Sequence, residues 1–166
     1  MMEIPVNGST SAEQKAQELL NIIGAAGIVP TPLDRIVDFL GYDVVAFEPS
    51  TNNTKNIAGA VSRQDKRIYV NNNDPSTRQR FTIAHEIGHI FIEGEQEHVD
   101  YRTDSNSEKE LMMNAFAAEL LMPVDVFKEK WYGFNKNIIT IADYFYVSLS
   151  AVRIRARNLG LFTYAI

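Results

Sequence analysis

Apolar residues recur at intervals of three or four along most of this chain, which predicts a largely helical protein. The helices are expected from Ser11 to about Ile23, from Thr31-Pro32 to Leu40, from Asp74-Pro75 to about Phe91, from Glu108 to Met122, and near 124–131, 138–146 and 149–159. Thr31 and Ser148 are predicted N-caps, because each precedes a helical run and carries a hydroxyl that can accept a backbone N–H. Pro123 ends the fourth helix.

Three segments instead are short and rich in β-branched and aromatic residues, which predicts strands. They are 42–47, 57–62 and 67–71, and a polar turn at 63–66 joins the last two. The polar stretch 93–106 is expected to be a loop. The fold class is therefore α+β, mostly helical, with a small three-stranded sheet that we expect to be antiparallel and packed on the helix at 74–91.

The chain of 166 residues is long enough for one domain with a sizeable core. We expect a flexible tail at 1–10 and a single domain at 11–166, whose C-terminal helical part is 124–166. The N-terminus lacks the apolar core of a signal peptide, and no apolar run reaches a membrane span, so a cytoplasmic protein is expected.

Composition narrows the chemistry further. The net charge is −5, which argues against a globally basic nucleic-acid binder. There are no cysteines, so neither disulfides nor thiolate metal sites can form. Any metal must be held by histidine and carboxylate side chains.

His85, Glu86 and His89 form an H-E-x-x-H motif inside the predicted helix at 74–91. Residues four apart lie on one face of a helix, so both imidazoles can reach one zinc ion. Glu86 is rotated by one residue, so it does not ligate the metal but flanks the open coordination position where a water would bind. It is expected to act as general base and acid, taking a proton from that zinc-activated water and passing it to the leaving amine. The motif predicts a zinc peptidase with one Zn²⁺ per chain.

The third ligand must come from elsewhere in the chain. A third histidine ligand could come from a His-x-x-Gly-x-x-His extension of the motif. That extension would need Gly at 92 and His at 95, but these positions hold Ile92 and Glu95. The candidates are then Glu110 and Glu119, which are nine residues and about 180° apart on a helix, so only one can face the metal. Spacing favours Glu110 but leaves both open. Asn114, one turn after Glu110, is a candidate for orienting a ligand.

Two segments closely resemble motifs of the ImmA/IrrE family of metallopeptidases. They are residues 78–89 (RQRFTIAHEIGH) and 110–123 (ELMMNAFAAELLMP). The second family motif reads roughly E-x-x-A-N-x-F-A-x-x-L-L-M-P. Its first glutamate is the family's third zinc ligand, so the resemblance implies a gluzincin-type site of His85, His89 and Glu110. Met113 stands where the family has alanine, which enlarges a packed position without moving a ligand.

The resemblance also implies a partner. Members of this family look like site-specific proteases that cut a helix-turn-helix repressor of a mobile element or stress regulon. The segment 141–153 itself resembles a helix-turn-helix, with Tyr146 in place of the usual turn glycine and Arg153, Arg155 and Arg157 alongside. The helices at 138–159 are therefore either a packing or partner-binding face or, as the weaker alternative, a DNA-binding surface. A non-proteolytic, metal-binding regulator remains the rival function.

Two further features, one segment and one residue, each have two interpretations. The strand at 67–71 is either an edge strand that holds substrate or an ordinary strand of the sheet. Arg78, seven residues before His85, either approaches the substrate or pairs with a carboxylate. Tyr69 and Tyr101 are the nearest tyrosines to the motif, but the donor to the oxyanion stays unassigned.

Overall fold

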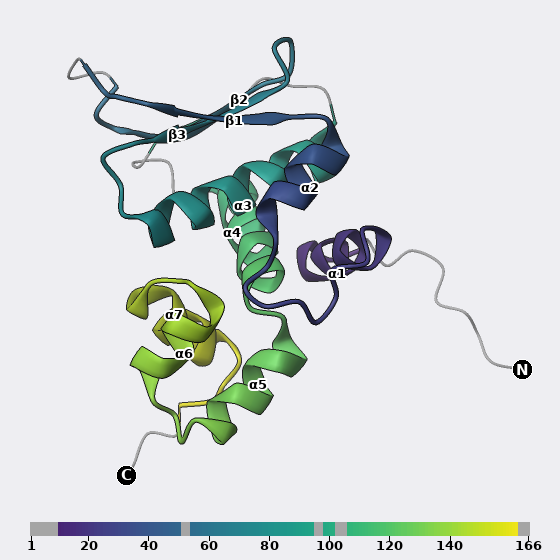
Figure 1. Cartoon of the computed structure of the whole chain (residues 1–166), viewed down its shortest axis with the longest axis vertical. Coiled ribbons are helices and arrows are strands. Elements are labelled where there is room, and N and C mark those ends of the chain that lie inside the picture. Colours follow the sequence, from purple (N-terminus) through teal and green to yellow (C-terminus); the bar gives the residue numbers. More distant parts are fainter. Residues whose placement is uncertain (1–9, 51–53, 95–97, 102–105, 163–166) are drawn as a thin grey trace, which may run out of the picture.

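The computed structural model describes residues 10–50, 54–94, 98–101 and 106–162. A sheet covers one side of a pair of long helices, and three shorter helices form the opposite end of the molecule (Figure 1). The helices are α1 Ala12–Ile22, α2 Leu33–Leu40, α3 Ser76–Glu93, α4 Glu108–Leu121, α5 Val124–Gly133, α6 Ile138–Phe145 and α7 Leu149–Asn158. The strands are β1 Asp43–Phe47, β2 Ile57–Ser62, β3 Arg67–Asn71 and β4 His98–Tyr101. The α+β class is confirmed.

The sheet differs from the expectation in two respects. It has four strands in the order β1-β3-β2-β4, because a short strand lies inside the stretch predicted to be a loop. It is also mixed, since β3 runs parallel to β1 and antiparallel to β2. The β2–β3 hairpin inserts β3 between β1 and β2, so sequence neighbours β1 and β2 are not neighbours in the sheet. The predicted antiparallel three-stranded sheet is wrong on both points.

The sheet packs on α3 as predicted. Gly59 of β2 makes this possible, because a Cβ atom there would lie 2.4 Å from Thr82 Cγ2 and 3.1 Å from Glu86 Oε1. Ile68 and Val70 of β3 are buried on the same face. A larger residue at position 59 would push α3 away from β2.

Of the seven helices in the described residues, α1, α4, α6 and α7 begin with a side-chain cap, whereas α2, α3 and α5 have a proline at the N-cap and no side-chain bond there. Ser11 and Gln14 form a capping box on α1, and the Ser148 hydroxyl accepts from the Ala151 N–H at the start of α7. The predicted cap of α2 by Thr31 is wrong, since Pro32 holds that position without a side-chain bond. Thr31 instead donates to the carbonyl oxygen of Leu120 at 2.7 Å and ties this turn to α4.

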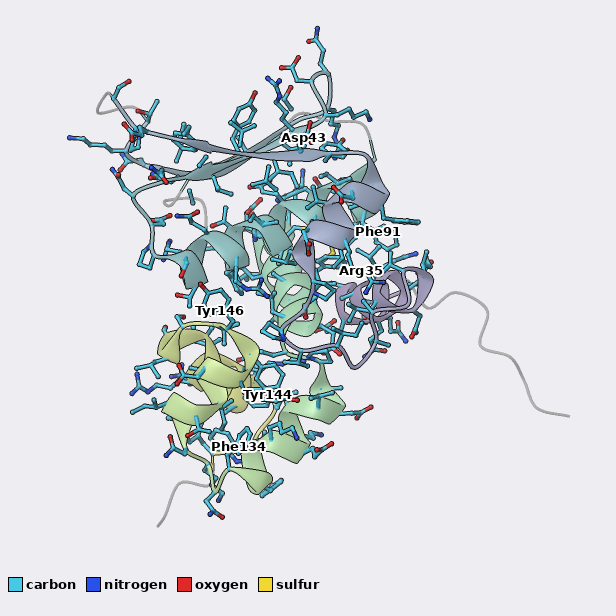
Figure 2. All side chains as sticks on the ribbon, viewed as in Figure 1. Arg35, Asp43, Phe91, Phe134, Tyr144 and Tyr146 are labelled. Carbon is cyan, nitrogen blue, oxygen red and sulfur yellow. The ribbon has the colours of Figure 1, made fainter. Side chains whose placement is uncertain are left out.

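The core is continuous from the sheet to the C-terminal helices. Gly88 of α3 lets α4 approach closely, because a Cβ there would lie 3.0 Å from both Met113 Sδ and Phe116 Cδ1. Met113, the departure from the family motif, is fully buried at this contact. Aromatic pairs hold the opposite end together, among them Phe134 and Tyr144 with ring centroids 5.6 Å apart (Figure 2). None of the helices in the described ranges combines the length and apolar character that a membrane crossing requires.

Candidate metal centre

His85 and His89 lie one turn apart on α3 and point to the same side of it. Both side chains are buried, and their Nε2 atoms are 3.2 Å apart. This arrangement follows from the i, i+4 geometry of a helix and was predicted from the motif.

Glu110 approaches the two imidazoles from the first turn of α4. Its Oε2 lies 2.8 Å from His85 Nε2, and its Oε1 lies 3.3 Å from His89 Nε2. One donor atom from each of the three residues lies within 4.8 Å of the others. Two ligands bound at 2.0–2.1 Å in a tetrahedral site would be separated by about 3.3 Å. The donor types and spacings therefore fit a single zinc-sized cation.

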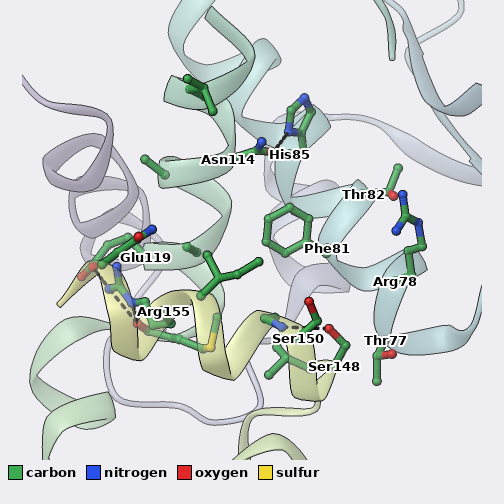
Figure 3. Close-up of a pocket in the computed structure, with 18 of the residues that line it drawn as sticks. Thr77, Arg78, Phe81, Thr82, His85, Asn114, Glu119, Ser148, Ser150 and Arg155 are labelled. Atoms are coloured by element: carbon green, nitrogen blue, oxygen red, sulfur yellow. Dashed lines mark hydrogen bonds and ion pairs between the residues drawn. The ribbon is translucent and has the colours of Figure 1, made fainter. Parts of the chain in front are cut away.

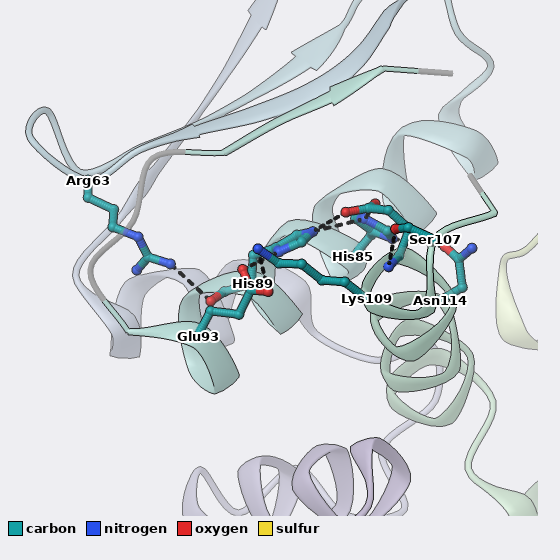
Figure 4. Close-up of polar contacts among 8 residues, drawn as sticks. Arg63, His85, His89, Glu93, Ser107, Lys109 and Asn114 are labelled. Carbon is teal, nitrogen blue, oxygen red and sulfur yellow. Dashed lines mark hydrogen bonds and ion pairs between the residues drawn. The ribbon is translucent and has the colours of Figure 1, made fainter. Parts of the chain in front are cut away.

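The other nitrogen of each imidazole is held by an oxygen (Figure 4). His85 Nδ1 lies 2.9 Å from Asn114 Oδ1, and His89 Nδ1 lies 2.7 Å from Glu93 Oε2. A histidine that donates its Nδ1–H to an oxygen presents the Nε2 lone pair to a metal. Asn114 was predicted to orient a ligand from its position after Glu110. Its amide oxygen lies beside His85, and the orienting role stays a prediction.

Sequence reasoning missed the partners of His89. Lys109 Nζ lies 2.9 Å from Glu93 Oε1, and Arg63 Nη2 donates to the carbonyl oxygen of His89 at 2.9 Å. The predicted loop at 93–106 includes Glu93, but this residue is the last of α3. Its spacing of four residues after His89 was the available signal, because α3 continues through this position.

Glu86 is fully buried between α3 and β2. Its Oε1 lies next to Gly59 of β2, 3.1 Å from where a Cβ atom of that residue would be. Its predicted role as general base and acid stays a prediction. The close approach at Gly59 fixes this side chain against the sheet.

Glu119 is also buried but belongs to a different set of contacts. Its Oε2 pairs with Arg155 Nη2 of α7, and its Oε1 accepts from Gln17 Nε2 at 3.0 Å and from the Val124 N–H at 3.2 Å. Of the two glutamates left open by spacing, the structure brings Glu110 and not Glu119 to the histidines.

Arg155 has a structural role at the same place. Besides the ion pair, its Nε and Nη2 donate to the carbonyl oxygen of Met122 at 3.1 and 2.9 Å. It is buried, whereas Arg153 and Arg157 are exposed. The expected run of three arginines on one partner-facing surface is therefore reduced to two.

The turn between α6 and α7 docks on the start of α3. Tyr146 takes a left-handed backbone conformation with φ of 55°, at the position where the helix-turn-helix pattern has glycine. Its hydroxyl donates to Ser76 Oγ at 2.9 Å, and the Arg80 guanidinium lies over its ring at 5.1 Å. Burial of that guanidinium lowers the pKa of Arg80. These contacts place α7 beside α3.

Three remaining candidates are resolved as follows. β3 lies inside the sheet, so it cannot hold a substrate as an edge strand. Strand alternation places Tyr69 on the sheet face opposite α3, which removes it as an oxyanion donor. Arg78 is half exposed and has its Nε 3.6 Å from Asp74 Oδ2. The side chains of His98 and Tyr101 lie outside the part of the chain that the structure describes.

The family model described as the IrrE N-terminal-like domain, peptidase family M78, matches residues 41–157. The chain belongs to this family. The match includes both motif helices and all three residues of the candidate metal centre, so the M78 family and the geometry point to the same site. The family is named for peptidases.

Among solved structures, this M78 chain is similar to a Mycobacterium tuberculosis transcriptional regulator. The TM-score is 0.59 at 16% sequence identity, and the match covers 83% of this chain and 45% of that chain. The likeness shows a shared fold, and this chain spans less than half the length of the regulator. A comparison with curated proteins finds no match.

Proposed function

We propose that this protein is a zinc-dependent endopeptidase of gluzincin type that cuts a helix-turn-helix transcriptional repressor at one or a few sites. The observation that carries the proposal is the convergence of His85 Nε2, His89 Nε2 and the Glu110 carboxylate within 4.8 Å in a chain of a peptidase family.

His85, His89 and Glu110 would hold one zinc ion through two neutral nitrogens and one carboxylate. Asn114 and Glu93 would keep both imidazoles in the tautomer that exposes Nε2. When bound, zinc supplies Lewis-acid polarisation and lowers the pKa of a coordinated water. Glu86 would accept the proton of the attacking water and deliver it to the leaving amine.

The substrate class has weaker support, which comes from outside the site. A protein of the same fold is named a transcriptional regulator, which links this fold to the control of transcription. Arg153 and Arg157 on α7 are exposed and could meet an acidic surface of a repressor. A repressor is also a cytoplasmic partner, in keeping with the location expected from the sequence.

The second candidate is a metal-binding regulator that grips a repressor or DNA through 138–159 without cutting. One observation favours it, namely the α6–α7 pair with a left-handed residue at the turn. Arg155 argues against DNA binding, because its guanidinium is paired with the buried Glu119 and does not reach the surface.

The decisive experiment compares the wild type with Glu86→Gln, which keeps the size of a buried side chain. We expect both to bind about one zinc ion, and we expect only the wild type to fragment a repressor encoded beside it on coexpression. The rate should fall by about 10²–10⁴-fold, the usual contribution of a general base.

Glu108→Gln is the matched control, because Glu108 is an exposed glutamate in the same turn as Glu110. It should cut like the wild type. An intact repressor in every variant, with zinc bound, would favour the non-cutting regulator. A salt-dependent DNA shift by the wild type would support its DNA-binding form.

A further inference from the structure

A pocket of about 900 Å³ opens beside His85 and Glu110 and extends to α7 (Figure 3). One of its walls is α3, a second is α4 and a third is α7. The pocket therefore joins the candidate metal centre to the C-terminal helices, and its size is that of sites that enclose a whole drug-sized ligand.

The α4 wall is an apolar stripe that begins next to the metal ligand. The stripe consists of Leu111, Ala115 and Ala118 of α4 and of Met122, which directly follows the helix as its C-cap. These residues follow one another at helical spacing, so they line one face of α4. Glu110 and Asn114 each precede a stripe residue by one position. A chain bound at the metal centre would thus meet apolar surface directly beside it.

Large apolar side chains of this pocket remain open to water. Leu111 is 53% exposed on α4, and Ile154 is 50% exposed on α7. Phe81 of α3 lies between His85 and α7 in Figure 3. Covering apolar area of this kind is favourable by about 25 cal/mol per Å². The polar residues Thr77, Arg78, Ser148 and Ser150 also line the pocket, on α3 and at the start of α7.

The α7 wall is anchored by contacts within the chain. Arg155 pairs with Glu119 and bonds to Met122, while Tyr146 bonds to Ser76. The pocket is thus formed by packed helices rather than by a loop that must close.

We propose that this pocket binds a run of at least two large apolar side chains of the substrate polypeptide, on one side of the bond that is cut. The proposal deepens the proposed function and rests on it. Apolar side chains are the chemical class that matches the α4 stripe, Phe81 and Ile154, and the volume exceeds what one side chain needs. The substrate preference would then be set by α4 and α7 and not by the zinc ligands.

The test measures binding separately from cutting. Fluorescein-labelled dodecapeptides carrying Leu-Leu or Ser-Ser at successive positions are titrated against zinc-loaded Glu86→Gln protein by anisotropy. We expect the best Leu-Leu peptide to bind at least about tenfold more tightly than its Ser-Ser counterpart, the range for apolar discrimination in a pocket.

Two variants that fill or charge the pocket should remove this preference. They are Ala118→Phe, on the half-buried α4 wall, and Ile154→Asp, at a half-exposed site that tolerates a charge. Ala26→Phe is the matched control, because Ala26 is exposed and lies outside the pocket. Zinc content and circular dichroism should be the same in all of them.

Equal binding of Leu-Leu and Ser-Ser peptides, or a preference that survives both pocket variants, would overturn the pocket assignment. Cutting by the zinc-loaded wild type is scored separately with the same peptides. Preferential binding without any cutting would contradict the endopeptidase and leave an apolar peptide-binding pocket. Cutting without a binding preference would contradict the apolar pocket and support the endopeptidase.

Discussion

The two ends of α4 carry buried glutamates with different consequences. Glu110 is 5% exposed and meets two imidazoles at 2.8 and 3.3 Å. Glu119 is 2% exposed and is paired with Arg155, with further donors from α1 and α5. One carboxylate faces two imidazole nitrogens that can share a cation with it, and the other is already paired with an arginine inside the protein.

The comparison of Glu110 with Glu119 shows that burial alone does not identify a glutamate as a metal ligand. Buried carboxylates need a positive partner, and that partner can be an arginine or a metal. Glu119 therefore joins α4 to α7, whereas Glu110 belongs to the candidate metal centre. Three substitutions test these two roles. Losses of stability and losses of zinc affinity are ranked on one free-energy scale, on which a 100-fold loss of affinity equals about 2.8 kcal/mol.

The largest effect is expected for Glu119→Ala. It leaves the Arg155 guanidinium buried without its anion, so the free energy of unfolding should fall by about 3–5 kcal/mol. Urea denaturation measures this loss, and the zinc content of the folded fraction should be unchanged. The double variant Glu119→Ala, Arg155→Leu should recover part of the stability. A loss below about 1 kcal/mol would mean that the pair behaves like a surface salt bridge.

The next effect is expected for Glu110→Ala. Zinc affinity should fall by more than about 100-fold, beyond the loss seen when only a supporting residue is removed. Competition with a chromogenic chelator and elemental analysis measure it. Glu108→Ala, two residues before Glu110 and exposed, should keep about one zinc ion per chain. If Glu119→Ala loses zinc while Glu110→Ala retains it, the assignment of the third ligand is wrong.

The smallest effect is expected for Glu93→Gln. Its carboxylate lies 2.7 Å from His89 Nδ1 and orients that ring, so zinc affinity should weaken by about 10–100-fold. Lys109→Met, which acts only through Glu93, should weaken it less. The same chelator competition serves here. Unchanged affinity in Glu93→Gln would show that His89 needs no support from this side.

Much of the fold could be predicted because it is locally encoded. Helical periodicity located all seven helices of the described residues to within a few positions, and Ser148 caps α7 as its hydroxyl suggested. β4 escaped prediction because a short edge strand needs only backbone hydrogen bonds, which its polar residues do not reveal. The parallel pairing of β1 and β3 escaped for a related reason, since strand order depends on which neighbours pack on α3.

The sequence by itself determined the chemistry of the candidate site. Two histidines four residues apart in a helix must share a face, and a chain without cysteine can complete such a site only with a carboxylate or another histidine. Tertiary structure alone decided which carboxylate it is. That choice depends on how α4 is rotated against α3, which the close contact of Gly88 with Met113 and Phe116 sets. The tertiary structure also decided that Glu93 supports His89 and that Arg155 is buried. Long-range packing of this kind cannot be read from local spacing.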